Sequence, residues 1–356
     1  MNDRESQGLT VAALTTIVLL SLVGTLTLGV GLRWALAGVP LLPGGFVELR
    51  HAHSHLGYYG VLFPLMWWAW RRLGQRAPGL GLLGLYAVGV VMSAVGFARE
   101  GYGRPAIIGS TIVLGVWLAS AWRLRGVMMQ PRSWLGGAAP TIVLGALCIG
   151  PVAVVSGRDP VLATGLVRMF LTLLLLGAVT PAALAALRAP GPPWPIWLGA
   201  VLCGAAFLGP LPHPALGLGL LVVGVLLGRA ALRAPSLGWD ERGLWLAFAL
   251  GLVAPGVGLV LPGHNLAVAG VHFAALGPLL VTLTRPLWPA RPPAWARWSY
   301  AVSVGAFATA LLVGEPRLAA VFGSVVAALW ALGVVWIVRH TLTQGAPLSV
   351  RVGTSA

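Results

Sequence analysis

Long apolar stretches alternate with short segments that hold most of the polar residues, prolines and arginines. Each stretch is close to the roughly 20 residues that a helix needs to cross a bilayer. Twelve can be counted, at about 9–31, 53–70, 79–98, 106–122, 138–156, 160–187, 194–211, 214–232, 243–262, 264–284, 298–314 and 317–338. The pattern predicts an all-α integral membrane protein, a bundle of about 12 transmembrane helices forming a single transmembrane domain over residues 1–356. No repeat of fixed period is visible.

Composition supports this interpretation. Of the 356 residues, 58% are hydrophobic and only 9% are charged, whereas soluble proteins carry about 25% charged residues. A water-soluble fold is therefore excluded. The first block follows a leader with two acidic residues and one basic residue, and it lacks an Ala-x-Ala cleavage site, so we expect a retained helix and not a signal peptide. The two cysteines, Cys148 and Cys203, lie in separate apolar blocks and are expected to be buried packing residues.

The net charge of +15 comes from arginine alone, because the chain has 23 arginines and no lysine. These arginines are scattered through loops, which argues against a nucleic-acid partner and leaves the lipid bilayer as the expected environment. With a cytoplasmic N-terminus, cytoplasmic segments hold 16 arginines and outer loops hold six. The positive-inside rule then predicts that both termini are cytoplasmic, in a bacterial-type inner (cytoplasmic) membrane.

Five of the seven histidines lie at the starts of two predicted helices. His51, His53 and His55 open the second helix, and His264 and His272 open the tenth. The predicted orientation puts both groups in the outer half of the membrane, where an imidazole is costly unless it faces a cavity, a cofactor or a partner. We expect His55 about one turn into its helix and His272 about 12 Å beyond His264.

Helical spacing separates these histidines by face. His51 and His55 are four residues apart and share a face, while His53 points nearly the opposite way. One imidazole from each of two helices suits the axial ligation of a haem iron. Three or four converging imidazoles would suit copper or zinc instead. Hydrogen bonding to loop backbone and water is an equal alternative for His51 and His53.

His55 and His272 are the predicted axial pair of one haem, because both are set inside the helix ends. The glycines at 57, 60, 270 and 277 are expected to leave room for a flat macrocycle. Arg50 can pair with haem propionates, and Arg168, the only arginine well inside a predicted helix, must face a partner. A copper or zinc site would draw on a different set, namely His51, His53, His55, His264 and His272. The remaining histidines, His213 and His340, are interpreted as a loop residue and a helix-end cation.

The segment His53-Ser-His55-Leu-Gly-Tyr-Tyr-Gly60 resembles the His-Ala-His-Leu-x-x-x-Gly pattern of proteins related to the catalytic subunit of haem-copper oxidases. The run His51-Ala-His53 is similar to the His-Ala-His run of the NnrS family of haem- and copper-containing membrane proteins. Both families use twelve helices, and the oxidases take low-spin haem ligands from helices two and ten. The resemblance implies a haem b site here, with copper as an alternative. The direct match covers about ten residues of helix two.

The departures from the oxidase pattern narrow the expected function. Blocks six and seven contain no histidine, so the copper ligands of an oxygen-reducing centre are missing. A proton-pumping terminal oxidase by itself is therefore not expected, and no catalytic residue is assigned. The resemblance implies electron transfer or handling of a small gas such as nitric oxide or oxygen, as an oxidoreductase-like subunit with other membrane or electron-carrier subunits as partners. The alternative is a polytopic transporter whose outer histidines line an entry path, although few intramembrane carboxylates support it.

Overall fold

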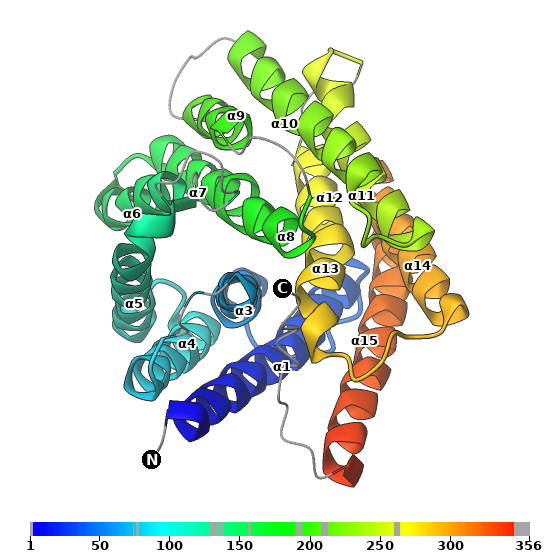
Figure 1. The fold of residues 1–356 in the computed structure, drawn as a ribbon. Coiled ribbons are helices and arrows are strands. Elements are labelled where there is room, and N and C mark those ends of the chain that lie inside the picture. Colours follow the sequence, from blue (N-terminus) through cyan, green and yellow to red (C-terminus); the bar gives the residue numbers. More distant parts are fainter. Residues whose placement is uncertain are drawn as a thin grey trace. The chain divides into compact units, whose positions relative to one another are not determined.

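The computed structural model describes residues 3–73, 75, 78–128, 134, 138–155, 158–189, 194–207, 213–259 and 264–344. Within this part of the chain the structure is all-helical, with twelve continuous helices and no strand (Figure 1). Nine of them are uninterrupted: α1 (Asp3–Leu36), α4 (Leu80–Glu100), α5 (Arg104–Met128), α6 (Ala138–Val155), α9 (Trp194–Ala205), α10 (His213–Arg233), α11 (Trp239–Gly256), α14 (Ala294–Val313) and α15 (Pro316–Gln344).

The other three helices each contain a π-helical segment. The second helix consists of α2 (Phe46–His55), η1 (Leu56–Leu62) and α3 (Phe63–Arg72). The sixth helix consists of α7 (Pro160–Leu174), η2 (Leu175–Val179) and α8 (Thr180–Ala186). The tenth helix consists of α12 (His264–Ala274), η3 (Ala275–Leu279) and α13 (Leu280–Thr284), and it ends in the 3₁₀ turn η4 (Arg285–Leu287). The predicted number of helices, twelve, is confirmed for the described residues, and the crossing of a membrane by all twelve stays a prediction.

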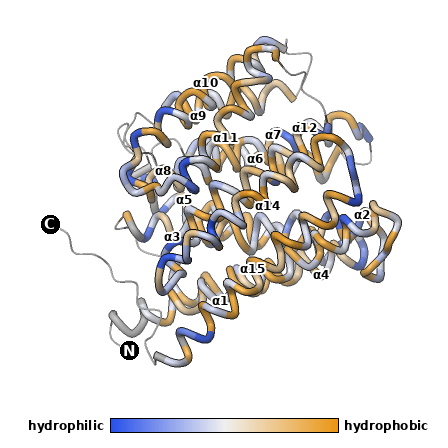
Figure 2. The backbone as a smooth tube through the Cα atoms, turned by 90° about the vertical axis from the view of Figure 1, so that its right-hand side faces the viewer, coloured by the Kyte–Doolittle hydropathy of each residue, from blue (hydrophilic) through white to orange (hydrophobic). Residues whose placement is uncertain are grey.

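Hydrophobic residues run along the length of the helices, and hydrophilic residues gather near helix ends and turns (Figure 2). Eight helices are long and apolar enough to cross a membrane by length and composition, within the ranges that the structure describes. Two shorter apolar helices cover Pro140–Val152 and Trp194–Ala205. These features are typical of a multi-pass membrane protein. The side of the membrane on which the termini lie remains a prediction.

The chain divides into two compact units. The first comprises Met1–Trp117 and Leu283–Ala356, and the second comprises Leu118–Thr282. In the first unit α1 packs against α15 and against the second helix, and α2 packs against α4. In the second unit α6 packs against α7, and α10 packs against α9 and α11. Cys148 and Cys203 are buried, as expected. The prediction of a single domain remains open.

Proline accounts for the unusual backbone of the second helix. The Phe63 amide donates to the carbonyl of Tyr58, five residues back, which is the π pattern. The next such bond would run from residue 64 to Tyr59, but Pro64 has no N–H. The hydroxyl of Tyr86 on α4 donates to the Tyr59 carbonyl instead. A side chain from a neighbouring helix thus satisfies the carbonyl that proline leaves without its donor.

The sixth helix also has a carbonyl that proline leaves without its backbone donor, and a different side chain donates to it. The Thr180 amide bonds to the Leu175 carbonyl, again five residues back. Pro181 follows and cannot donate to Gly177, four residues back. The Thr141 hydroxyl on α6 donates to the Gly177 carbonyl over 2.8 Å. In both helices, therefore, a neighbouring hydroxyl stabilises the interruption.

Candidate cofactor site

The second helix begins earlier than its hydropathy predicts. It starts at Phe46, in the polar run before the apolar block. His55 is therefore nine residues after the helix start (55 − 46), about 13.5 Å along the axis, and not one turn in. His272 lies eight residues after His264 (272 − 264), about 12 Å along the tenth helix. Counted from its helix start, each predicted ligand thus lies eight or nine residues along its own helix.

The His55 ring is held by contacts from two helices. Its Nδ1 lies 2.9 Å from the carbonyl oxygen of His51, one turn earlier on α2. The ring stacks on Phe97 of α4, with centroids 3.8 Å apart and planes 23° apart. The Tyr59 ring approaches it edge-on at 5.2 Å. His51 also lies on this face, with its ring centroid 6.4 Å from that of His55, as the helical spacing predicts.

His272 makes the same backbone contact in the second unit. Its Nδ1 lies 2.8 Å from the carbonyl oxygen of Val268, again one turn earlier on the same helix. A carbonyl oxygen can only accept, so Nδ1 carries the proton in both His55 and His272. The neutral ring then has its lone pair on Nε2. Histidines that bind metals commonly donate their other ring N–H to a backbone carbonyl in this way, which fixes the tautomer.

His53 belongs to a different environment. Its Nδ1 lies 2.9 Å from the carbonyl oxygen of Thr25 on α1. Its ring fills the space beside Gly29, where a Cβ would come within 2.9 Å of the imidazole Cε1. The side chain therefore packs between two helices of the first unit, away from the face of His51 and His55. This favours the packing role over the metal-ligand role for His53.

His51 lies near the loop that joins α4 to α5. Its ring meets that of Tyr102 edge-on at 4.8 Å. Tyr102 lies in that loop and is 45% exposed. Burial raises the pKa of its hydroxyl, and the charge of Arg50 partly counters this shift. Arg50 itself is exposed on α2, and its pairing with a haem propionate stays a prediction.

The remaining candidates in the second unit, His264 and Arg168, are both exposed. His264 begins α12 and is exposed. Arg168 was expected to face a partner because it lies well inside its predicted helix, and its side chain is exposed on α7. Its guanidinium carbon lies 5.9 Å from the centre of the Phe207 ring, a cation–π contact. Among the described residues, no group of three or more His, Cys, Asp or Glu side chains is placed to hold a metal ion.

The pairing of His55 with His272 remains a prediction. His55 belongs to the first unit and His272 to the second, and the structure describes each unit by itself. What the structure brings together is the His51, His55, Phe97 and Tyr102 group within the first unit. What it shows separately is the matching backbone contact of His272.

Two of the glycines expected to make room for a macrocycle have another role. At Gly60 the place of a Cβ is already taken by the side chain of Ser21 on α1. At Gly57 a Cβ would lie 3.3 Å from Thr25, also on α1. These glycines permit close packing of α1 against the second helix, so the expectation of space beside them is wrong. Beside Gly270 no heavy atom lies within 4 Å of a Cβ position, so space remains there.

The three helices with a π segment share a sequence pattern that the apolar blocks alone do not indicate. His55 precedes Gly60 by five residues, and His272 precedes Gly277 by five. In the sixth helix the residue five before Gly177 is Thr172. Each glycine lies within or at the edge of a π segment with a proline close behind: Pro64, Pro181 or Pro278. The spacing of glycine and proline inside apolar blocks was the available signal.

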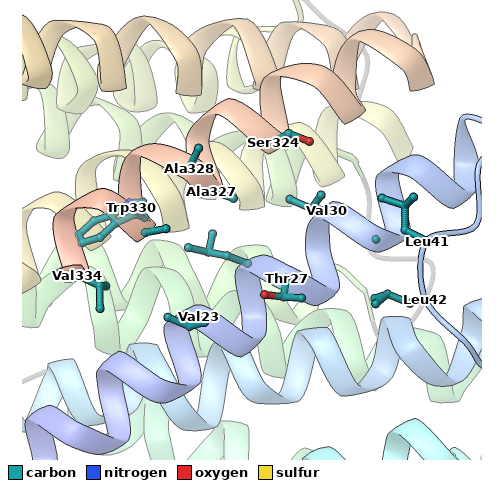
Figure 3. A pocket seen from close by; sticks show the side chains of 13 residues that line it. Val23, Thr27, Val30, Leu41, Leu42, Ser324, Ala327, Ala328, Trp330 and Val334 are labelled. Carbon is teal, nitrogen blue, oxygen red and sulfur yellow. The ribbon is translucent and has the colours of Figure 1, made fainter.

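One pocket of the first unit lies away from these residues. It is a groove of about 360 Å³ between α1 and α15, lined by residues such as Val30, Leu42 and Trp330 (Figure 3). The Trp34 indole N–H on α1 donates to the Ser324 hydroxyl on α15 over 3.0 Å. None of the predicted cofactor ligands lines this groove. The candidate site is therefore the histidine face of the second helix and its counterpart on the tenth.

Comparisons with protein-family models, with curated proteins and with solved structures give no match to this chain.

Proposed function

We propose that this chain is a membrane haem protein that holds one b-type haem through His55 and His272. One observation carries the proposal: the two imidazoles make the same Nδ1 bond to the carbonyl four residues earlier, over 2.9 and 2.8 Å. Each also stands five residues before a glycine at an interruption in its helix. π segments occur frequently at functional sites.

The donor chemistry fits haem better than a protein-only copper or zinc site. Bis-imidazole ligation needs one neutral ring from each of two helices, whereas zinc in a structural site takes four protein ligands and in a catalytic site three. His53 is engaged with α1, and no cluster of three ligands occurs among the described residues. Arg50 is accessible for a propionate, as a guanidinium can bind a carboxylate bidentately.

Electron transfer is the activity that this ligand set favours. Bound haem supplies reversible one-electron chemistry at its iron. The two histidines would hold the haem iron, and their carbonyl partners would keep the two rings in place. Binding of nitric oxide or oxygen requires an open position, so a gas-handling role would require one imidazole to leave. The proposed location is a bacterial-type cytoplasmic membrane, with an electron-carrier partner.

A visible spectrum of the purified protein tests the proposal. We expect a Soret band and a reduced-minus-oxidised difference spectrum typical of a six-coordinate b-type haem. Carbon monoxide should leave the reduced spectrum unchanged if both axial positions are filled, and a shifted Soret band would indicate the gas-handling role. Absence of haem, together with absence of copper and zinc by elemental analysis, would contradict the redox proposal and favour the transporter alternative.

A further inference from the structure

Phe97 makes the closest ring contact to His55. The two rings are stacked at 3.8 Å with 23° between their planes, and Phe97 is 1% exposed. The bond from Nδ1 to the His51 carbonyl fixes one atom of the imidazole but leaves the ring free to tilt about that bond. The stack removes this freedom, because a tilt would drive the imidazole into the phenyl ring.

The position of Phe97 is in turn set by backbone contacts and not by flexible side chains. At Gly96, the neighbouring residue, a Cβ would lie 2.5 Å from the backbone nitrogen of Ala106 on α5. At Gly109 a Cβ would lie 2.5 Å from the backbone nitrogen of Ser93 on α4. The outer halves of α4 and α5 are therefore in close backbone contact. Phe97 also packs with Ala52 and Ala106 in a buried cluster.

We propose that Phe97 is a positioning residue that fixes the plane of the His55 imidazole for ligation of the haem iron. This role follows from the stacked geometry and from the close packing that holds Phe97, on α4, against α2 and α5. It rests on the proposed haem function for its spectroscopic consequences. The restraint on the His55 ring is a property of the first unit alone and can be measured without haem.

Phe97→Leu is the direct test, since leucine keeps apolar contact and removes the flat ring. We expect haem affinity to fall about 10- to 100-fold, as for loss of other groups that orient a metal ligand. The g values of the low-spin ferric haem, measured by electron paramagnetic resonance, should also shift. Phe97→Tyr, which keeps the ring, should restore the wild-type g values. If Phe97→Leu does not fold, Phe97→Met takes its place, because methionine also fills the volume without a flat ring.

Phe248→Leu is the matched control. Phe248 is a buried phenylalanine on α11, 5% exposed, and its described ring contact is with Trp245. This variant should alter stability without moving the g values. Wild-type g values together with wild-type haem affinity in Phe97→Leu would overturn the proposal.

A second readout separates this inference from the proposed function. Diethylpyrocarbonate modifies exposed imidazole nitrogens, and mass spectrometry locates the product. In haem-free protein the His55 modification rate should rise in Phe97→Leu and stay unchanged in Phe97→Tyr and Phe248→Leu. An unchanged rate in Phe97→Leu would contradict the positioning role. If the wild-type protein binds no haem but the His55 modification rate still rises in Phe97→Leu, only the haem function is contradicted.

Discussion

The second and sixth helices contain the same interruption but differ in the residue that precedes it. Both have a π segment, a glycine and a proline four residues after that glycine. A hydroxyl from another helix satisfies a carbonyl in each, from Tyr86 in one and Thr141 in the other. Yet five residues before the glycine the second helix has His55 and the sixth has Thr172. The π-helical interruption is therefore a structural feature that does not depend on the histidine.

The tenth helix sharpens this comparison. It has the histidine, His272, at the same distance from its glycine, but Pro278 follows Gly277 directly. The position of the proline thus differs between these two helices, whereas in both the histidine Nδ1 donates to the carbonyl one turn earlier. Two helices with the histidine and one without it provide an internal control for any role assigned to this position.

The largest effect, on haem content, is expected from replacing the residue five positions before the glycine in each of the three helices. His55→Ala and His272→Ala should each abolish bound haem, because loss of an axial ligand leaves the iron with one protein ligand. Thr172→Ala should leave haem content unchanged. The measurement is the pyridine haemochrome content per protein of each purified variant. Full occupancy in either histidine variant would reject the pair.

Further controls keep this result specific to the proposed ligands. His53→Ala, on the same helix, should retain haem because the His53 ring packs against α1. His340→Ala and His213→Ala, at the starts or ends of other helices, should also retain haem. Loss of haem in His53→Ala with normal folding would contradict the packing role of His53 and show that His53 is needed to hold the haem.

A smaller effect is expected from filling the shared glycine position. Gly60→Ala and Gly177→Ala place a Cβ against Ser21 and Thr141 respectively. We expect each to destabilise the protein by about 1–3 kcal/mol, as overpacking does elsewhere. Unfolding in detergent, followed by circular dichroism, measures this. Gly84→Ala on α4 is the control, because nothing lies within 4 Å of its Cβ position, and it should be neutral. Neutral behaviour at Gly60 and Gly177 would show that the close approach carries no constraint.

The smallest effect is expected from removing the hydroxyls that satisfy the interrupted helices. Tyr86→Phe and Thr141→Val each leave a carbonyl without its side-chain donor. Hydrogen bonds between membrane helices contribute about 0.6–1.7 kcal/mol, so we expect losses in that range from both variants. The same unfolding measurement applies. A loss in only one of them would mean that the two interruptions are not stabilised alike.

The apolar blocks predict the helices well because hydropathy and length are properties of the segment itself. The second helix shows the limit of that approach. Its first turns, from Phe46 to Ala52, contain Glu48, Arg50 and His51, so no apolar run marks them. Packing of α2 against α1 and α4 extends the helix there. The expectation that His55 lies one turn into its helix was therefore wrong, because the helix begins at Phe46.

The sequence by itself determined the all-helical class, the twelve helices and the two groups of histidines, because these depend on residue type and local spacing. It also separated His53 from the face of His51 and His55 by helical angle. It did not decide what each side chain meets. The tertiary structure directs His53 to α1, stacks Phe97 on His55, exposes Arg168 and fills the space beside Gly60 with Ser21. Those outcomes depend on which helices become neighbours, and they join residues far apart in the chain, where no local pattern records the contact.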